Sequence, residues 1–403
     1  MTKGWHTKKL GDLLEVQNGY AFSSKDYSAS GHFVIRIGNV QNGYISLTDP
    51  KYIDLPADGA LQRFVLSEGD VLVSLTGNVG RVGVIQKEHL PAALNQRVAR
   101  LTIREGSPAS KKFLLFFLYS DWFREELIGA GHGAAQQNVS TKDLVEIELP
   151  VPPLSEQRRI VGILDEAFEG LATAKANAEQ NLQNARALFE SHLQAVFTQR
   201  GAGWVESALG DVCEFENGDR GKNYPNRNEY VESGIPWINT GHIQRDGTLS
   251  HSDMNFITQE KYESLRSGKI QPGDLVYCLR GATLGKTALV EPYTAGAVAS
   301  SLVILRPRRS LDSRFLYSFL TSPLGQGLIK GYENGAAQPN LGAKSVAKYP
   351  ISLPTLAEQK RIVEKLDSLR EETQRLESLY QRKLAALDEL KKSLLHRAFS
   401  GQL

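Results

Sequence analysis

The sequence predicts an α+β protein built from two tandem, duplicated domains with small twisted β-sheets, each followed by a long helix. Three observations support this class: a motif that occurs twice at the start of a helical run, a set of shared blocks upstream of each run, and short β-type runs between glycine-rich turns. We expect the first domain at residues 1–151 and its helix at 152–201. The second domain is expected at 202–353 and its helix at 354–403.

The two long helices are predicted from a repeated start. Leu154-Ser-Glu-Gln-Arg-Arg-Ile-Val161 returns as Leu356-Ala-Glu-Gln-Lys-Arg-Ile-Val363, with six of eight positions identical. Prolines upstream of each copy disfavour an earlier helix start, and Gly201 and Gly401 follow the two runs as stop signals. Thr355 and Glu358 have the spacing of a capping box, and Ser155 is the expected cap in the first copy.

Apolar residues recur along both helices at heptad spacing, which predicts that they pack together as an antiparallel coiled coil with internal pseudo-two-fold symmetry. At equivalent positions in the middle, one helix has small side chains where the other has large ones. At ~1.5 Å per residue such a helix spans roughly 65 Å, the length of a spacer. The alternative is two unrelated amphipathic helices, each covering its own domain. The paired positions are Ile160, Leu164, Ala167, Ala174, Ala178, Ala185, Leu188 and His192 in the first helix, and Ile362, Leu366, Leu369, Leu376, Tyr380, Leu387, Leu390 and Leu394 in the second.

The domains themselves are duplicated. The block from Leu10 to Gly19 matches the block from Leu209 to Gly218, and each follows a tryptophan, Trp5 or Trp204. Further matches join 68–77 with 272–281, 113–118 with 315–320, and 133–138 with 335–340. Shared ancestry of the halves follows from this number of blocks in the same order, and a shared task is the natural expectation.

Each domain is expected to contain several short strands and one helix. In the first domain the helix is predicted over about 113–127, followed by a loop and a strand near Ile147. The predicted strands are 33–37, 71–75, 82–85 and 98–103 in the first domain, and 236–239, 275–279, 287–290 and 302–306 in the second.

Composition is that of an ordinary soluble chain, with 41% apolar and 23% charged residues among 403. We expect a cytoplasmic protein, because no secretory signal pattern is present and the most apolar run, 113–119, is too short for a bilayer. Cys213 and Cys278 are expected as core residues, and the eight histidines lack metal-ligand spacing. Charge is balanced, with 16 basic and 16 acidic residues in 1–154 and 16 and 15 in 201–354, so basicity alone does not indicate nucleic acid.

Two motifs resemble catalytic ones without matching them. Gly281-Ala-Thr-Leu-Gly285-Lys286-Thr287 has three residues between the glycines where a phosphate-binding loop has four, and no helix pattern follows. Asp49-Pro-Lys-Tyr52 lacks the second proline of the motif with which amino-methyltransferases hold a flipped base. No catalytic constellation is repeated in both halves, so the chain is not expected to be a catalyst, and we expect no metal or cofactor on it.

Over its full length the sequence resembles the specificity subunit of type I restriction-modification systems. The resemblance is carried by the tandem domains, by Pro152-Pro-Leu-Ser-Glu-Gln-Arg-Arg-Ile160 and Pro354-Thr-Leu-Ala-Glu-Gln-Lys-Arg-Ile362 after them, and by the closing Leu395-His-Arg-Ala-Phe-Ser-Gly401. It implies a non-catalytic DNA-binding subunit in which each domain reads one half of a bipartite target and the helices set the spacing. Two modification subunits, which carry S-adenosylmethionine and methylate adenine, would dock on it, and two restriction subunits that use ATP and Mg could join. Half-sites read from one face of DNA lie about 34 Å apart.

Candidate DNA contacts are polar residues in blocks that the two domains share but with different side chains, because the two half-sites of a target usually differ. Arg reads guanine and Asn or Gln reads adenine through two hydrogen bonds. Arg81 and Lys286 are the better candidates for phosphate. The full set is Arg36, Asn39, Asn78, Arg81, Asn95, Gln96, Arg97, Gln136, Asn138, Arg220, Lys222, Asn223, Tyr224, Arg227, Asn239, His242, Arg280, Lys286, Ser300, Ser301, Gln338 and Asn340.

Two other functions stay open at this point. The chain could be a coiled-coil adaptor that never reads DNA, in which case exchanging residues 1–150 would alter no methylation pattern. It could also be a nucleotide-binding enzyme, which would require the turn from Gly281 to Thr287 to hold phosphate. For any single candidate residue, a role in a solvated loop or a turn is an alternative to DNA contact.

Overall fold

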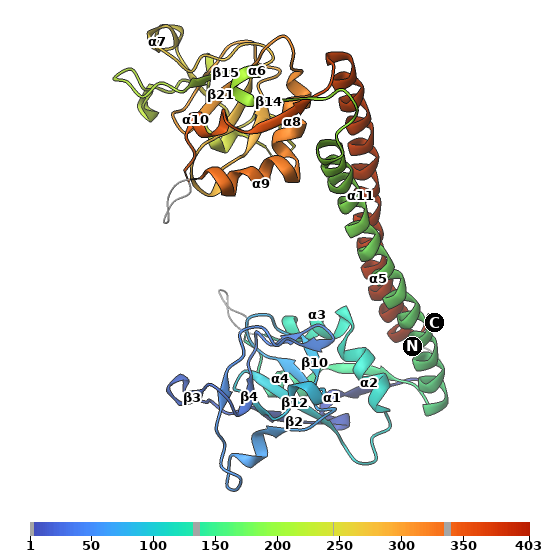
Figure 1. Ribbon diagram of the computed structural model, residues 1–403. Helices are drawn as coiled ribbons and strands as arrows, with labels where there is room; N and C mark the ends of the chain where they lie inside the picture. Colours follow the sequence, from blue (N-terminus) through green and yellow to red (C-terminus); the bar gives the residue numbers. More distant parts are fainter. Residues whose placement is uncertain (1–3, 132–137, 245, 334–339) are drawn as a thin grey trace. The chain divides into compact units, whose positions relative to one another are not determined.

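The computed structural model describes residues 4–131, 138–244, 246–333 and 340–403. The chain divides into two compact units, residues 1–179 with 382–403 and residues 180–381. Each unit therefore contains one domain, one half of the helix that follows it and one half of the other long helix (Figure 1). We call them the first and the second unit.

The two long helices are α5 (Leu154–Thr198) and α11 (Leu356–Phe399). Lys175 pairs with Asp388 in the first unit and Arg186 with Glu377 in the second, both at 2.9 Å. Because the number rises along α5 as it falls along α11, the helices run antiparallel, as predicted (Figure 1).

Burial along the helices agrees with the heptad pattern except at three positions. Ala178 and Ala185 are buried. Leu188 and Leu390 are 52% and 48% exposed and His192 is exposed too, so placing these three residues in the interface between the helices was wrong. At the helix starts, the Thr355 hydroxyl accepts the N–H of Glu358, which confirms that cap. Ser155 lies inside α5, which begins one residue earlier, so it is not the cap of that helix.

The first domain contains three sheets and a small hairpin, and all four predicted strands are present in it. A two-stranded sheet pairs β1 (His6–Lys9) with β13 (Glu148–Val151). A four-stranded antiparallel sheet has the order β10-β9-β12-β2: Val82–Val84, Val71–Ser74, Val98–Ile103, Leu14–Asn18. A five-stranded sheet has the order β3-β7-β4-β11-β8: Tyr27–Ser28, Tyr52–Ile53, His32–Ile35, Ala92–Leu94, Val65–Leu66; the hairpin is β5 (Val40–Gln41) with β6 (Tyr44–Ile45).

The second domain repeats this plan. β14 (Val205–Ala208) pairs with β22 (Pro350–Leu353). The four-stranded sheet has the order β15-β21-β18-β19: Cys213–Asn217, Leu302–Pro307, Leu275–Cys278, Thr287–Leu289. A three-stranded sheet has the order β17-β16-β20: Asn255–Ile257, Ile235–Ile238, Ala297–Val298. Figure 1 shows the two domains with these sheets and the long helices.

Where one helix was predicted in the first domain, the structure has two, α2 (Lys111–Leu118) and α3 (Asp121–Gly129). Ser120 separates them, because its hydroxyl accepts the N–H of Phe123 and starts a new helix. In the second domain Ser322 separates α8 (Ser313–Thr321) from α9 (Pro323–Tyr332) in the same way. The short helices are α1 (Leu10–Leu13), α4 (Thr141–Glu146), α6 (Leu209–Val212), α7 (Gln259–Ser264) and α10 (Ala343–Val346), with 3-10 turns at Ser24–Asp26, Gln62–Phe64, Lys87–His89, Arg227–Glu229, Thr240–His242 and Gly281–Thr283.

The hydrophobic cores join each domain to the long helices. In the first unit Phe399 of α11 packs edge-on against Phe113 and Phe117 of α2. In the second unit Phe197 of α5 packs against Phe315 and Phe319 of α8. Each domain is thus fixed to the end of the helix that does not directly follow it.

Both cysteines are buried, as predicted, and burial raises the pKa of the Cys213 thiol to about 12. Across the described part of the chain, no helix is both long enough and apolar enough to cross a membrane.

Candidate nucleic-acid interface

The candidate interface begins at one edge of the five-stranded sheet. β4 and β11 run parallel, with Phe33 to Ile35 beside Ala92 to Leu94, so both strands end at the same edge. Arg36 and the turn 95–97 follow directly. In the second domain β16 and β20 are also parallel, and Asn239 and the turn 299–301 follow them. The fold therefore places these predicted residues together in each domain.

Backbone hydrogen bonds bring further loops to this edge in the first domain. The Gln96 N–H donates to the Tyr20 carbonyl (2.8 Å), and the Leu75 N–H donates to the Arg97 carbonyl (2.9 Å). The Val139 N–H then donates to the Leu75 carbonyl (2.9 Å), and Asn138 forms a bridge with Thr76. We call residues 19–22, 75–78, 95–97 and 138–139 the first loop cluster.

The second domain has the same framework. The Leu279 N–H donates to the Ser301 carbonyl and the Leu341 N–H to the Leu279 carbonyl, both at 2.9 Å. Asn340 forms a bridge with Arg280, and Arg220 Nη2 donates to the Ser300 carbonyl at 3.3 Å. We call residues 218–220, 279–281, 299–301 and 340–341 the second loop cluster. Predicted residues that lie 60 and 80 positions apart in sequence, Arg280 with Asn340 and Arg220 with Ser300, thus meet in it.

A repeated glycine permits this convergence. A Cβ on Gly19 would lie 1.9 Å from the Asn95 carbonyl oxygen, and one on Gly218 would lie 2.5 Å from that of Ala299. Both distances are shorter than any real contact of this kind, so only glycine lets the loops approach. The Asn-Gly pair that occurs in both domains therefore has a structural reason.

The side chains of the two clusters differ in kind and in exposure. Gln96 and Arg97 are exposed, and Arg97 has a positive φ of 69°, which holds its side chain on a tight turn. Asn95 is buried, and within the described residues its Oδ1 has no hydrogen-bond partner. In the second cluster Arg220, Arg280 and Asn340 are exposed, and Ser300 and Ser301 are half-buried. The backbone framework is therefore shared, while the polar groups that it presents are not.

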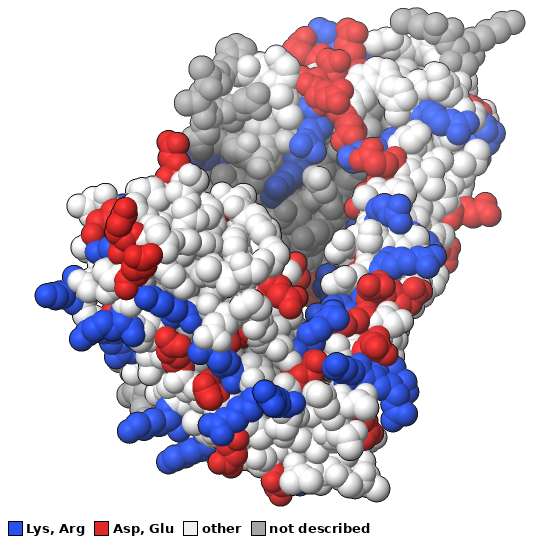
Figure 2. Space-filling model, turned by 90° about the horizontal axis from the view of Figure 1, so that it is seen from above, with Lys and Arg blue, Asp and Glu red and all other residues white. Residues whose placement is uncertain are grey.

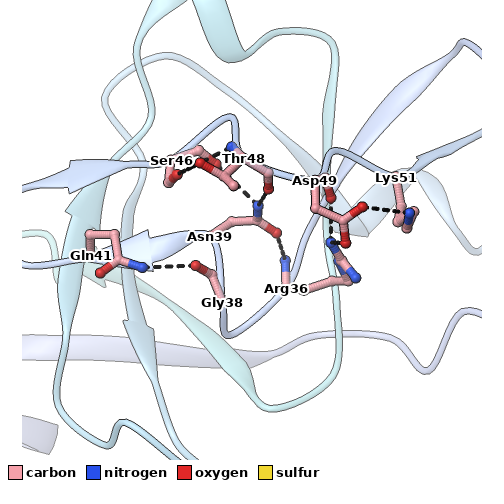
Figure 3. A network of polar contacts seen from close by, with 8 residues as sticks. All are labelled: Arg36, Gly38, Asn39, Gln41, Ser46, Thr48, Asp49 and Lys51. Atoms are coloured by element: carbon pink, nitrogen blue, oxygen red, sulfur yellow. Dashed lines mark hydrogen bonds and ion pairs between the residues drawn. The ribbon is translucent and has the colours of Figure 1, made fainter. Parts of the chain in front are cut away.

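Two of the predicted residues beyond β4 are used inside their own loop. The Asn39 amide accepts the Arg36 N–H (3.1 Å) and donates to two loop carbonyls, and the residue is 1% exposed. The Arg36 guanidinium pairs with Asp49 at 3.1 Å (Figure 3). Lys51 and then Arg36 lower the pKa of Asp49 by hydrogen bonds, so this carboxylate stays charged beside the guanidinium. Asn39 thus shapes the loop, and Arg36 would have to leave Asp49 to contact a base.

The two predicted phosphate contacts tie neighbouring loops together. Arg81 Nη1 donates to Gln41 Oε1 at 2.8 Å, and Lys286 Nζ donates to the Ile243 carbonyl at 2.7 Å. Asn78 is exposed and lies beside Arg81. With its side-chain amide oriented so that the oxygen faces the guanidinium, this oxygen accepts hydrogen bonds from Arg81 Nη1 and Nη2 at 3.2 and 3.0 Å. The strand β19, not a helix, follows Lys286, as the sequence indicated. The turn from Gly281 therefore lacks the helix start that a phosphate-binding loop uses.

Asn239 and His242 cap a short turn. The Asn239 side chain accepts the Gly241 N–H at 2.9 Å, and His242 Nδ1 accepts the Asn239 N–H at 3.1 Å. His242 is 4% exposed, and burial lowers its pKa, so the ring is neutral at pH 7.

In the basic and aromatic segment of the second domain, some side chains pack within the domain and others are exposed. Tyr224 packs edge-on against Trp237, with ring centres 5.2 Å apart, and Asn223 Nδ2 donates to the Ser264 carbonyl at 2.7 Å. Lys222 and Arg227 are exposed. The two remaining predicted residues, Gln136 and Gln338, lie outside the described residues.

Sequence reasoning did not select Tyr20 or Arg266. Tyr20 is 42% exposed in the first loop cluster and packs on Phe22 and Phe64. The Arg266 side chain is 74% exposed and reaches the buried Asp219 at 3.5 Å, beside the second cluster. The signal for Tyr20 was its place directly after the repeated Asn-Gly pair. Arg266 lies in no shared block, so no repeat indicated it.

Charge on the surface is mixed. On the face that Figure 2 shows, basic and acidic side chains are interspersed over the white background. Among the residues that the structure describes, no three His, Cys, Asp or Glu side chains come together as they would to hold a metal ion.

Comparison with known proteins gives the family. Residues 2–183 and 202–383 each match the type I restriction modification DNA specificity domain, so the two matches cover most of the chain. The chain belongs to this family. Among relatives of the specificity family, the EcoKI specificity subunit from Escherichia coli is 24% identical over all of this chain and 90% of its own length. The EcoBI specificity subunit, also from Escherichia coli, is 24% identical over 99% of this chain and 86% of its own.

Solved structures share the specificity-subunit fold. A chain from a study of complex assembly and conformational transition of the type I R-M system aligns with a TM-score of 0.75 at 22% identity, covering 100% of this chain and 99% of its own. The HsdS subunit from Thermoanaerobacter tengcongensis gives 0.59 at 22% identity, covering 100% and 98%. The predicted architecture of two tandem domains with long helices is thereby confirmed.

The signature motif of this specificity protein has a structural role that its sequence did not reveal. Gln157 is fully buried; its amide donates to the Pro108 and Pro152 carbonyls (2.8 and 2.9 Å). Gln359 repeats the arrangement with Ser310 and Pro354 (2.9 and 3.0 Å). The repeated glutamine thus fastens the first turn of each long helix to its domain.

Proposed function

We propose that this chain is the DNA specificity subunit of a type I restriction-modification complex, and that each loop cluster reads one half of a bipartite target. The observation that carries the proposal is the pair of loop clusters, which share one backbone framework and present different polar side chains. A common framework with exchanged side chains is what reading two different half-sites requires.

The exposed arginines and amides of the clusters are the proposed base contacts. Arg97 with Gln96 would act in the first half-site, and Arg280, Arg220 and Asn340 in the second. Arg81, Lys286, Lys222 and Arg227 are proposed for the DNA backbone, where a single positive charge suffices. Asn138 and Tyr20 stand next to the first set and would contribute amide or stacking contacts.

The subunit is non-catalytic, as specificity subunits are, and the chemistry belongs to its partners. Two modification subunits would carry S-adenosylmethionine and methylate adenine, and two restriction subunits would supply ATP- and Mg-dependent cleavage. The nearly balanced charge of the chain, with 47 basic and 45 acidic residues, is consistent with partners that supply much of the attraction to phosphate. The long helices would fix the distance between half-sites and dock the modification subunits.

Methylation mapping tests this proposal. The chain is expressed with its modification subunit in a host free of other adenine methylation, and modified bases are located by single-molecule sequencing. We expect one bipartite motif with a fixed gap. The adaptor alternative is tested by exchanging residues 1–150 for another such domain. A change confined to one half-site supports DNA reading by that domain. An unaltered methylation motif overturns the proposed reading and favours the adaptor.

A further inference from the structure

The long helices contact the domains through side chains at equivalent positions in both units. Asp165 of α5 pairs with Lys112 at 2.6 Å, and Asp367 of α11 pairs with Arg314 at 2.8 Å. Each of these positions differs by 202 from its equivalent, as Gln157 does from Gln359. At their starts, the two helices therefore offer a domain the same groups.

The far ends of the helices are equally interchangeable. Phe399 lies 5.2 and 5.3 Å from the rings of α2, and Phe197 lies 5.3 and 5.5 Å from those of α8. Leu395 and Leu193, one turn earlier, are both buried. Neither the starts nor the ends of the helices distinguish α5 from α11.

The middle of the helices does distinguish them, first by charge. α5 contributes the bases Lys175 and Arg186, and α11 contributes the acids Asp388 and Glu377 that pair with them. Lys175 is equivalent to Glu377, and Arg186 to Asp388. If two copies of α5 paired in this register, Lys175 would face Arg186. Two copies of α11 would set Glu377 against Asp388, so both like pairs are repulsive.

Contacts between cations and aromatic rings also distinguish the two helices, because each helix supplies one kind of partner. Lys391 Nζ lies 5.2 Å from the ring centre of Phe168, and Arg370 Cζ lies 5.0 Å from that of Phe189. Both rings belong to α5 and both cations to α11. A pair of α11 helices would bring Arg370 against Lys391, and a pair of α5 helices would lose both cations.

Side-chain size follows the same division. α5 has the small residues Ala174, Ala178 and Ala185, where α11 has Leu376, Tyr380 and Leu387. A pair of α5 helices would leave space between small side chains, and a pair of α11 helices would crowd large ones.

We propose that the middle of α5 and α11 forms a heterotypic pairing surface, which selects an α5 helix for an α11 helix and rejects a second copy of either. One chain then closes on itself and keeps two different domains together. Assembly of two identical halves is disfavoured. This inference does not depend on what the domains bind.

The test uses the full chain with a protease site in the 199–203 linker, cut after purification. The two halves are separated in denaturant and returned to buffer, and native mass spectrometry counts mixed and like pairs. Random pairing gives about one half mixed pairs, and we expect the mixed pair to exceed the like pairs on the order of tenfold or more.

The decisive variant exchanges two contacts without losing them. Arg186→Glu with Glu377→Lys and Phe189→Arg with Arg370→Phe keep both kinds of contact between the helices in the mixed pair, although the contact of Arg370 with the Tyr317 ring is lost. Each helix then carries one acid and one base of the ion pairs, and one ring and one cation of the cation–ring contacts. The share of like pairs should now rise markedly towards the random value, and the selection that remains should be that of side-chain size. Exchange of the other ion pair, Lys175→Asp with Asp388→Lys, should weaken the selection in the same direction. Random pairing in the unaltered protein, or undiminished selection in these variants, would overturn the proposal.

Discussion

The side-chain oxygen of Gln157 accepts a 2.8 Å hydrogen bond from the backbone N–H of Ser110, which precedes helix α2. Gln359 Oε1 accepts the Asp312 N–H at the same distance before α8. In each unit one buried side-chain amide therefore binds three backbone groups. Two of them lie in the loop before a domain helix, and the third lies in the segment that enters a long helix.

Replacing this glutamine should destabilise the unit that contains it. Gln157→Ala removes three hydrogen bonds and leaves two carbonyls and one N–H without partners, so we expect the free energy of unfolding to fall by about 2–4 kcal/mol. Thermal and urea unfolding of the purified protein measure this. Gln183→Ala, at an exposed position of the same helix, is the matched control and should change stability little. Equal stability of the two variants would contradict the fastening role.

Gly19→Ala should distort the first loop cluster, because the new Cβ would meet the Asn95 carbonyl oxygen at 1.9 Å. We expect a loss of more than about 2 kcal/mol in stability together with weaker reading of one half-site. Gly38→Ala is the control, since nothing lies within 4 Å of its Cβ position. A Gly19→Ala protein that melts and methylates like the control would show that the loops do not need this close approach.

Arg97→Ala should weaken DNA binding at one half-site without affecting the fold. The side chain is exposed, and alanine meets the same backbone strain at positive φ as arginine does. Loss of a base contact of about 1–3 kcal/mol lowers affinity roughly 5- to 150-fold. Binding of the assembled methyltransferase to targets altered in one half or the other measures the effect. Lys25→Ala, at an exposed position of the same domain outside the first loop cluster, should leave affinity within about twofold, and equal effects of both variants would argue against a base contact.

Asp219 should make the second domain sensitive to acid. Its carboxylate accepts the N–H groups of Arg266 (2.9 Å) and Gly221 (2.7 Å), and these bonds lower its pKa below the ordinary value of 3.8. A lowered pKa stabilises the fold above the unfolded-state pKa, and this stabilisation is lost as pH falls through the folded-state pKa. Asp219→Asn should therefore be less stable than the unaltered protein at pH 7, and the difference should shrink below about pH 4. A difference in unfolding free energy that is constant from pH 7 to pH 3 would contradict this.

Much of the architecture could be predicted from repeats and periodicity. Both long helices, the four predicted strands of each domain and the Thr355 cap follow from local patterns that the structure bears out. The break at Ser120 was missed because the apolar pattern continues across it, and only the capping geometry of its hydroxyl divides the helix. The exposed Leu188 and Leu390 show that heptad spacing identifies a stripe without fixing how much of it is covered.

The candidate site was less predictable. Comparison of the repeats found residues at the shared edge, such as Arg97 and Arg280, because they stand in equivalent blocks. It could not separate these from Asn39 and His242, whose polar atoms are used within buried turns. Nor could it assign Gln157 its role, because its three partners lie up to 49 positions away and meet it only after folding.

The spacing of half-sites tests the central claim most directly. One heptad is inserted after Glu179 in α5 and another after Gln381 in α11, which preserves the register and lengthens the helix pair by ~10 Å. Methylation mapping should then show the same two half-sites separated by a gap about three base pairs longer, at ~3.4 Å per base pair. A gap of unchanged length, or half-sites with different bases, would contradict the account.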